Sequence, residues 1–155
     1  MEAKLDQIDK KILNILQGNA KITNSQLAIE IGLSPAPTLE RVKKLENAGV
    51  IKSYHAELDQ EKMGLGVCVF IQATLQGSNK TLMESFQRKI QQIPEVVECY
   101  HITGTADFLL KILSKDIKTY NDFILDRLIE ITEIGNLQSM VVLSTMKNAK
   151  TLPFF

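Results

Sequence analysis

The stretch that decides the fold is TNSQLAIEIGLSPAPTLERVKKLEN, residues 23–47. It contains two helix-initiation signals with a glycine-containing turn between them. Thr23 and Gln26 have the spacing of a capping box, which predicts the start of one helix. Ser34 followed by Pro35 is typical of an N-cap and a first helical residue, which predicts the start of another. Two helices joined by so short a turn are the pattern of a helix-turn-helix.

The second of these helices, expected over Pro35–Asn47, has two unlike faces. Leu39, Val42 and Leu45 recur at steps of three and predict the side that faces the core. The opposite side is expected to be exposed, with donors and acceptors that suit base edges in a major groove. Its members are Pro37, Glu40, Arg41 and Lys44, flanked by Lys43. A solvated helix face is the alternative interpretation.

The segments on either side of this motif extend the first domain. Apolar residues at steps of three and four over residues 5–16 predict an amphipathic helix that ends at Gly18 and Asn19. After the motif, Val50–Ala56 alternates weakly. It is expected to be a short strand or wing, or else a packed linker.

Near residue 60 the apolar period changes, which predicts a second domain of the α+β class. Its order of elements, β-α-β-β-α-β, is that of a ferredoxin-like fold. We expect strands at Val67–Leu75, Val96–Thr103, Phe108–Leu113 and Leu137–Met146, and helices capped by Ser78 and Asp116. The inner face of the second helix is expected to be Ile117, Tyr120, Ile124, Leu128 and Ile131. Such a sheet has helices on one face only, which predicts at least a homodimer covering the other.

These patterns give a predicted domain organisation. Residues 1–57 form the helix-turn-helix domain, 58–66 a linker, 67–147 the ferredoxin-like domain, and 148–155 a C-terminal tail. The tail ends in Leu152-Pro153-Phe154-Phe155. We expect it to pack on a neighbouring subunit or to be a frayed end.

Composition narrows the class of protein. The chain has 155 residues with 18 basic and 18 acidic side chains, so its zero net charge argues mildly against a nucleic-acid binder. Residues 38–52 nevertheless carry four basic and two acidic side chains, a local charge of +2. Cys68 and Cys99 lack metal-binding spacing and are expected to be buried free thiols. No apolar run approaches the length of a membrane span and no signal peptide precedes the first helix, so we expect a cytoplasmic protein without a membrane partner, metal or cofactor.

The order and spacing of several segments resemble the Lrp/AsnC family, the leucine-responsive or feast/famine regulators, over about residues 3–147. The matching segments are LDQID at 5–9, GLSPAPTLERVKKLE at 32–46, GVI at 49–51, PEV at 94–96, Thr103-Gly104 with Asp107, and SMVVL at 139–143.

The resemblance implies a non-enzymatic, sequence-specific transcription regulator that binds double-stranded DNA. The DNA-binding residues that it implies are Asn24, Ser34, Pro35, Pro37, Thr38, Glu40, Arg41, Lys43 and Lys44. It also implies dimers formed through the sheet of the second domain, which assemble further, often into octamers.

An amino-acid effector bound at contacts between dimers is a further implication of the resemblance. The corresponding positions are Thr103, Gly104, Thr105, Asp107, Gln138, Ser139 and Met140. The family's commoner turn is Gly-Asp-x-Asp, whereas this chain has Thr105 and Ala106. Backbone N–H groups beside Gly104 would donate to a carboxylate and Asp107 would receive an ammonium group, or the segment is an ordinary hairpin turn whose aspartate satisfies its own backbone.

Two other classes of protein compete with this interpretation. An architectural protein that wraps DNA with little sequence specificity would rely on phosphate contacts, and the neutral net charge argues against it. Some tetrapyrrole decarboxylases share the fold of the family. The chain has two histidines, His55 and His101, and neither has a cysteine, histidine or carboxylate partner at a spacing typical of a catalytic site. We therefore expect His101 to pack in the fold or to line a ligand pocket.

Overall fold

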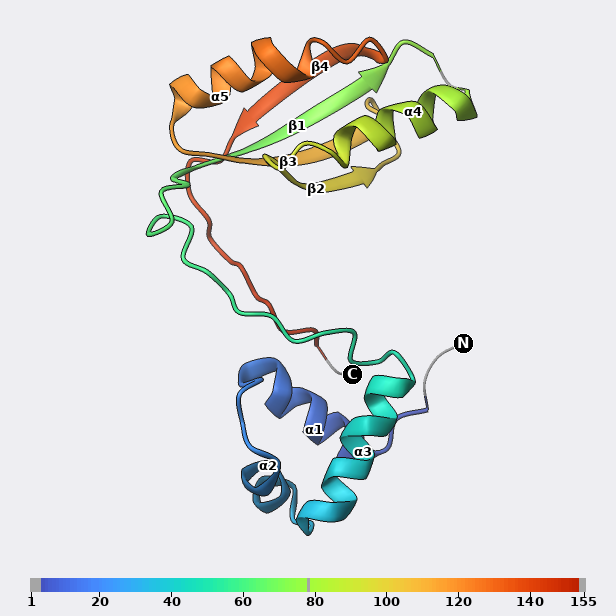
Figure 1. The fold of residues 1–155 in the computed structure, drawn as a ribbon, viewed down its shortest axis with the longest axis vertical. Helices are drawn as coiled ribbons and strands as arrows, with labels where there is room; N and C mark the ends of the chain where they lie inside the picture. Colours follow the sequence, from blue (N-terminus) through green and yellow to red (C-terminus); the bar gives the residue numbers. More distant parts are fainter. Residues whose placement is uncertain (1–3, 78, 154–155) are drawn as a thin grey trace. The chain divides into compact units, whose positions relative to one another are not determined.

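The computed structural model describes residues 4–77 and 79–153, and these fall into two compact units (Figure 1). One unit combines residues 1–57 with 146–155, and the other comprises residues 58–145. The C-terminal tail therefore belongs to the unit of the N-terminal helices. Residues 1–3, 78 and 154–155 are not described.

Three helices form the first unit: α1 (Gln7–Gly18), α2 (Asn24–Ile31) and α3 (Pro35–Asn47). A capping box begins α2, where the Thr23 side chain accepts from the Gln26 N–H. Gly32 ends α2 with a φ of 77°, a left-handed conformation that favours glycine and turns the chain toward α3. The predicted helix-turn-helix is confirmed. Its core consists of Ile12, Leu13, Leu27, Ile31 and Leu45, with partly buried residues packed around them.

The buried face of α3 differs from the predicted one by about one residue. Thr38 is fully buried and its Oγ1 donates to the Ser34 carbonyl oxygen at 2.9 Å, whereas Leu39 is 43% exposed. The prediction that Leu39 faces the core is wrong. Thr38, Val42 and Leu45, at steps of four and three, form the inner face instead. A threonine fits there because the preceding turn of its own helix satisfies its hydroxyl.

The segment after α3 is extended but unpaired. In the described residues between 50 and 57 no strand forms, so the predicted wing is a single extended stretch. Val50 and Ile51 pack on the helical core. Tyr54 is 46% exposed, and its hydroxyl donates to Glu46 of α3 at 2.8 Å.

The second unit is a four-stranded antiparallel sheet with the strand order β2-β3-β1-β4, which confirms the predicted ferredoxin-like class (Figure 1). Its strands are β1 (Val67–Leu75), β2 (Val96–His101), β3 (Phe108–Ser114) and β4 (Ile134–Val141). Its helices are α4 (Lys80–Ile90) and α5 (Ile117–Phe123), and α5 continues as a π-helical turn at Ile124–Leu128.

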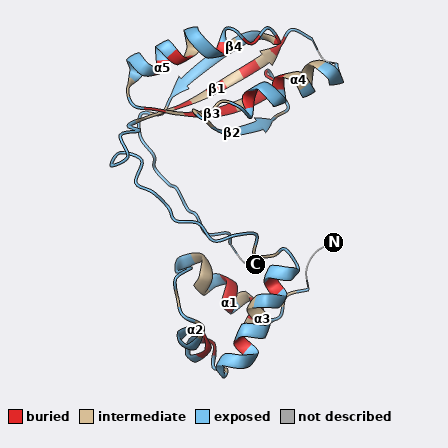
Figure 2. Ribbon diagram, in the orientation of Figure 1, coloured by how far each residue is buried: buried red, intermediate tan, exposed pale blue. Residues whose placement is uncertain are grey.

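The core of this unit lies between the sheet and its helices. Alternate residues of β1 and β3 point into it, and Figure 2 shows buried residues along both strands. Phe86 of α4 and Leu128 of the π-helical turn are fully buried against them. The other face of the sheet carries the remaining alternate residues, which are half-buried, including Phe70, Leu109 and Leu113.

Several predicted boundaries and burial assignments in this unit are wrong. The last strand begins at Ile134 and ends at Val141, and the Val142 N–H still donates to the Cys68 carbonyl of β1. Ile117 is 54% exposed as the first residue of α5. Asn79 caps α4, and Ser78 lies outside the described residues.

The two cysteines are free thiols. Cys68 is half-buried and Cys99 is exposed on the edge strand β2, so the prediction that both are buried is wrong. Partial burial still raises the pKa of both thiols, which favours their neutral form.

A buried carboxylate joins α4 to the start of β4. Glu133 accepts from Lys89 Nζ at 2.7 Å and from Ser85 Oγ at 2.6 Å. These two bonds, that of Lys89 first, lower the pKa of Glu133 to about 2. Glu133 is 8% exposed, so its loss is expected to affect the stability of the unit.

We expect Glu133→Gln to lower the free energy of unfolding by about 1–2 kcal/mol at neutral pH, since a charge-assisted hydrogen bond is lost. A carboxyl group with a depressed pKa stabilises the fold above its ordinary pKa of 4.5, and that contribution disappears as the pH falls toward about 2. Urea unfolding should therefore show a difference between variant and parent that shrinks over this range. Glu130→Gln, at an exposed position, is the matched control. A difference independent of pH would contradict this assignment.

Candidate nucleic-acid interface and effector region

The exposed face of α3 is polar and lies opposite Thr38 and Leu45. Its outermost residues follow steps of four and three and include Glu40 and Lys43, with Lys44 beside them. The full exposed set consists of Pro35, Ala36, Pro37, Leu39, Glu40, Lys43, Lys44, Glu46 and Asn47. The predicted contact residues Pro35, Pro37, Glu40, Lys43 and Lys44 are therefore all accessible.

The first turn of α3 presents unused polar groups. Ser34 is an exposed N-cap whose side chain makes no capping hydrogen bond. Asn24, the first residue of α2, donates from its Nδ2 to the Pro35 carbonyl oxygen at 2.7 Å. That bond joins the N-termini of α2 and α3. The N-terminus of a helix carries partial positive charge, which suits a phosphate. Because Pro35 and Pro37 have no N–H and the Thr38 N–H donates to the Ser34 carbonyl, the Ala36 N–H is the amide that the first turn of α3 offers.

Thr38 and Arg41 do not share this accessible surface. Thr38 is fully buried, so the prediction that it contacts DNA is wrong. Arg41 points back toward the start of α1, where its Nη1 donates to Asp6 at 2.7 Å and to Asp9 at 2.8 Å. Arg41 is thus half-exposed and its guanidinium is bonded to these two carboxylates, whereas Glu40 is exposed; contact of Arg41 with DNA stays a prediction.

The Arg41 ion pairs are integrated into the cap of α1. The Asp6 side chain accepts from the Asp9 N–H, and the Asp9 side chain accepts from the Asp6 N–H. The bond from the Asp9 N–H, followed by that of Arg41, lowers the pKa of Asp6. The same carboxylates, Asp6 first, raise the pKa of Arg41. This cap therefore links the start of α1 to the middle of α3.

The predicted effector turn lies between β2 and β3. Thr103, Gly104 and Thr105 are exposed there, and Gly104 has a φ of 126° that other residues rarely adopt. Asp107 is held by β1, because its carboxylate accepts from the Leu75 N–H at 2.8 Å and its own N–H donates to the Ala73 carbonyl. The Asp107 carboxylate thus satisfies a backbone group of a neighbouring strand, while its carbonyl oxygen accepts from the Ile102 N–H at 2.9 Å and closes the turn.

The predicted effector segment of β4 lies two strands away from that turn. Gln138 is paired with Gln72 of β1, and Met140 with Phe70, on the sheet face without helices. Ser139 points to the opposite face, where its hydroxyl is hydrogen bonded to Tyr120. Since neighbouring strands are about 4.8 Å apart, roughly 10 Å separates the two halves within one chain.

Sequence reasoning missed three functional roles in the first unit. Asp6 and Asp9 had the three-residue spacing of a capping box, which was the available signal for a helix start. Their pairing with Arg41 spans 32 residues or more, and no local pattern reveals it. The Tyr54–Glu46 bond likewise depends on how the extended segment runs back along α3.

Comparison with known proteins agrees with this geometry. Residues 5–52 match a family model described as a winged helix-turn-helix DNA-binding domain, and residues 68–152 match one described as an Lrp/AsnC ligand binding domain. Together they define a transcriptional regulator with an N-terminal DNA-binding domain and a C-terminal ligand-binding domain.

The chain belongs to the Lrp/AsnC family. It is 39% identical to the transcriptional regulator AzlB of Bacillus subtilis over 99% of this chain and 98% of that protein. It is 38% identical to the leucine-responsive regulatory protein of Haemophilus influenzae, over 96% and 89%. A transcriptional regulator from Neisseria meningitidis, solved as a complex with L-methionine, superposes with a TM-score of 0.93 at 37% identity, over 97% of each chain.

None of the described helices has the length and apolar character that a membrane crossing requires. His101 stacks against Phe108 with ring centroids 5.1 Å apart, which is a packing role. His55 lies in the extended segment after α3 and is exposed.

We expect Arg41→Ala and Asp9→Asn to lower the thermal stability of the first unit in parallel, because each removes one side of the same ion pair. Both should also weaken binding to matched and scrambled duplexes by the same factor, as a misplaced α3 would. Circular dichroism melts and fluorescence anisotropy measure the two effects.

Asp9→Asn makes this test decisive, since it removes a negative charge and simple electrostatics would then favour DNA binding. A DNA-reading Arg41 predicts the opposite pattern. In that case Arg41→Ala would relax base preference without loss of stability, and Asp9→Asn would leave DNA affinity unchanged or raised.

Proposed function

We propose that the chain reads DNA with the first turn and exposed face of α3, and that an amino acid bound by the second unit modulates this binding. The accessible stripe of α3 supports the first part, because it offers an acceptor in Glu40 and donors in Lys43 and Lys44. The family membership and the bound ligand of the Neisseria relative support the second part.

The DNA contacts divide by the type of group they reach. The Ser34 hydroxyl and the Ala36 N–H at the start of α3 are placed for a phosphate, with Asn24 holding α2 against that turn. Glu40 and Lys43 lie on the outermost stripe and suit base edges or phosphates in the major groove, with Lys44 flanking them. Pro35 and Pro37 restrict the backbone of the first turn. Arg41 acts through the orientation of α3.

We expect Lys43→Ala to weaken DNA binding without changing the melting temperature, because Lys43 is exposed and makes no ion pair among the described residues. If Lys43 contacts a phosphate, the slope of log affinity against log salt should fall in magnitude by about 1, and affinity should fall for all sequences. If it contacts a base, one position of the binding site should lose preference. Lys118→Ala, exposed on α5 of the other unit, is the control. Unchanged affinity and slope for Lys43→Ala would contradict the proposed surface.

Assembly through the sheet is the second element of this proposal. The face of the sheet without helices carries Phe70, Leu109, Leu113 and Met140, and Tyr100 is 49% exposed beside them. Lys111 and Glu98 form an ion pair at 2.9 Å within this surface. An apolar face of this kind, with its few charges already paired, suits a symmetric contact with a second copy. Dimers of this type would then associate further.

The effector site is best completed between copies. The exposed turn at 103–105 offers backbone N–H groups and hydroxyls for a carboxylate, and Gln138 and Met140 offer a polar group and an apolar surface. Within one chain the two halves are separated by β1. A second copy that brings its own segment to the turn would close the site around one amino acid, with Asp107 holding the turn in place.

We expect at least one apolar amino acid, with methionine and leucine tested first, to raise the melting temperature of the full chain. A ligand at a hundredfold excess over its Kd stabilises by about 2.7 kcal/mol. Gln138→Ala should lower the affinity for that amino acid about tenfold, since one hydrogen bond is lost. Differential scanning fluorimetry against all twenty amino acids measures both effects.

Two variants serve as controls for this experiment. Asn121→Ala, exposed on α5, should leave the amino-acid response unchanged. Phe70→Asp should separate the copies in sedimentation velocity and abolish the response. A wild-type monomer, or a full response in monomeric Phe70→Asp, would contradict a site formed between copies, and no response to any amino acid would contradict the sensing role.

A further inference from the structure

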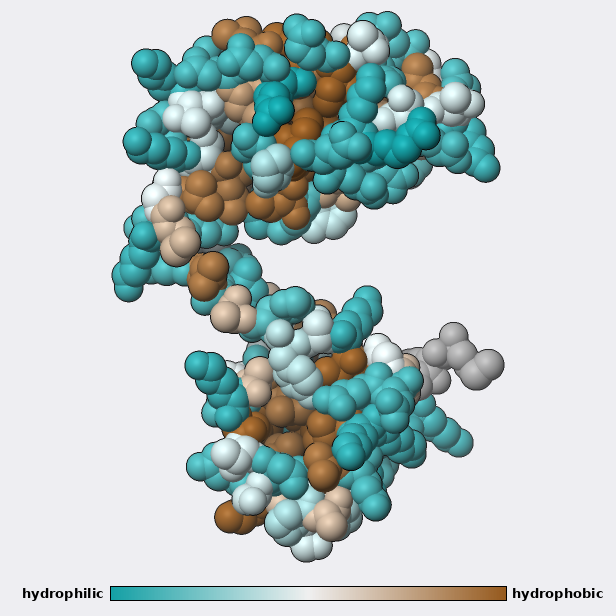
Figure 3. Space-filling model, viewed as in Figure 1, coloured by the Kyte–Doolittle hydropathy of each residue, from teal (hydrophilic) through white to brown (hydrophobic). Residues whose placement is uncertain are grey.

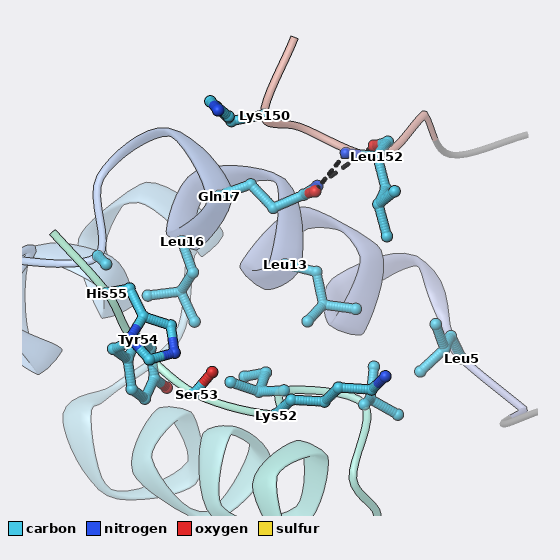
Figure 4. Close-up of a pocket in the computed structure, with 13 residues that line it drawn as sticks. Leu5, Leu13, Leu16, Gln17, Lys52, Ser53, Tyr54, His55, Lys150 and Leu152 are labelled. Atoms are coloured by element: carbon cyan, nitrogen blue, oxygen red, sulfur yellow. Dashed lines mark hydrogen bonds between the residues drawn. The ribbon is translucent and has the colours of Figure 1, made fainter. Parts of the chain in front are cut away.

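The first unit contains a groove that the DNA-binding surface does not use. It has a volume of about 370 Å³ and lies between α1, the extended segment after α3, and the C-terminal tail (Figure 4). Leu13 and Leu16 line it from α1, and Ser53, Tyr54 and His55 line it from the extended segment. Its volume falls in the range of small-molecule sites.

The C-terminal tail forms one wall of this groove. The Leu152 N–H donates to the Gln17 side chain, whose Nε2 donates back to the Leu152 carbonyl at 3.3 Å. The Lys150 Nζ atom lies 3.6 Å from the Glu57 Oε1 atom. Within its own chain the tail is therefore tied to α1 at Leu152, so this residue is not a frayed end, and packing of the tail on a neighbouring subunit stays a prediction. Phe154 and Phe155 lie outside the described residues.

The groove combines an apolar body with positive charge. Figure 3 shows apolar side chains gathered at the surface of the helical unit, and Leu152 is 75% exposed where it meets the groove. Among the thirteen described residues that line the groove, Lys52 and Lys150 are cationic and none is acidic. Lys150 has Glu57 as a partner, whereas Lys52 makes no ion pair with any described residue.

We propose that this groove binds an apolar monocarboxylate, with the carboxylate on Lys52 and the hydrocarbon part on Leu13, Leu16 and Leu152. The absence of an acidic group from the described lining argues against an amine or an amino acid, whose ammonium would have no counter-charge. An uncharged hydrocarbon would leave Lys52 unused. A branched aliphatic or an aromatic acid without an amino group satisfies both parts of the lining.

A ligand bound in this groove would affect α3 through Tyr54. Tyr54 lines the groove and donates its hydroxyl to Glu46 of α3 at 2.8 Å. Burial, followed by the bond to Glu46, raises the pKa of Tyr54 to about 12, so the phenol remains a donor at working pH. A ligand packed against its ring therefore fixes a side chain attached to the recognition helix. This site is independent of the amino-acid site of the second unit.

The test is isothermal titration calorimetry of the full chain with 4-methylpentanoate and phenylacetate. Both acids should bind, whereas 4-methylpentan-1-ol, 4-methylpentylamine and leucine should not bind at this site. Lys52→Glu should lower the affinity for the acids at least about tenfold, since a charge-assisted contact becomes a repulsion. Leu152→Asp should also weaken the binding of both acids. Lys118→Glu, the same charge change on α5, should bind like the parent chain.

The outcomes separate this site from the amino-acid site. The proposal stands if Lys52→Glu loses the acids but retains the thermal response to an amino acid. It is overturned if neither acid binds, if the alcohol binds as well as the acid, or if Lys52→Glu binds like the parent. A change of oligomeric state in Lys52→Glu and Leu152→Asp, without acid binding by the parent, would assign the groove to a second copy and also overturn it.

Discussion

The geometry of the first unit depends on one ion-paired cap. Arg41 of α3 donates to Asp6 and Asp9, and these carboxylates also satisfy the first backbone amides of α1. Three short helices bury only a small apolar core, so crossing angles are weakly determined by packing alone. The cap adds a directional constraint, since hydrogen bonds to a planar guanidinium require a particular geometry. The exposed stripe of α3 faces outward because Thr38 and Leu45 are buried, and Val42 partly buried, on its inner side, and the cap adds a polar link from α3 to α1.

In the second unit the corresponding constraint is the one-sided cover of the sheet. Both helices pack on the same face, and the core behind them is closed by Phe86 and Leu128. The opposite face keeps half-buried apolar residues, and the effector segments lie at the edges of that arrangement. Association of two copies of such a domain would bury apolar surface and complete the ligand site, so both effects favour assembly.

Most of the fold could be predicted from local signals in the sequence. Capping residues and apolar periods located the helices, and alternation located β1 from end to end. Properties set by distant partners were not accessible in the same way. The rotation of α3, which buries Thr38 and exposes Leu39, depends on how α3 packs against the other helices, and the ends of β4 depend on its pairing with β1. The predicted DNA surface therefore correctly included the accessible Lys43 and Lys44. It wrongly included the buried Thr38, and it placed Arg41 as fully exposed although this residue is half-exposed.

The position of the C-terminal tail affects how the domains of such regulators can be exchanged by recombination. The helical unit is discontinuous in sequence, because residues 146–155 return to it after the sheet is complete. A single recombination event near residue 57 would join these helices to a tail shaped by a different ancestor, leaving Gln17 and Leu16 opposite foreign side chains. Inheritance of the intact unit requires two crossovers, so chimeric regulators should exchange both ends of the gene together.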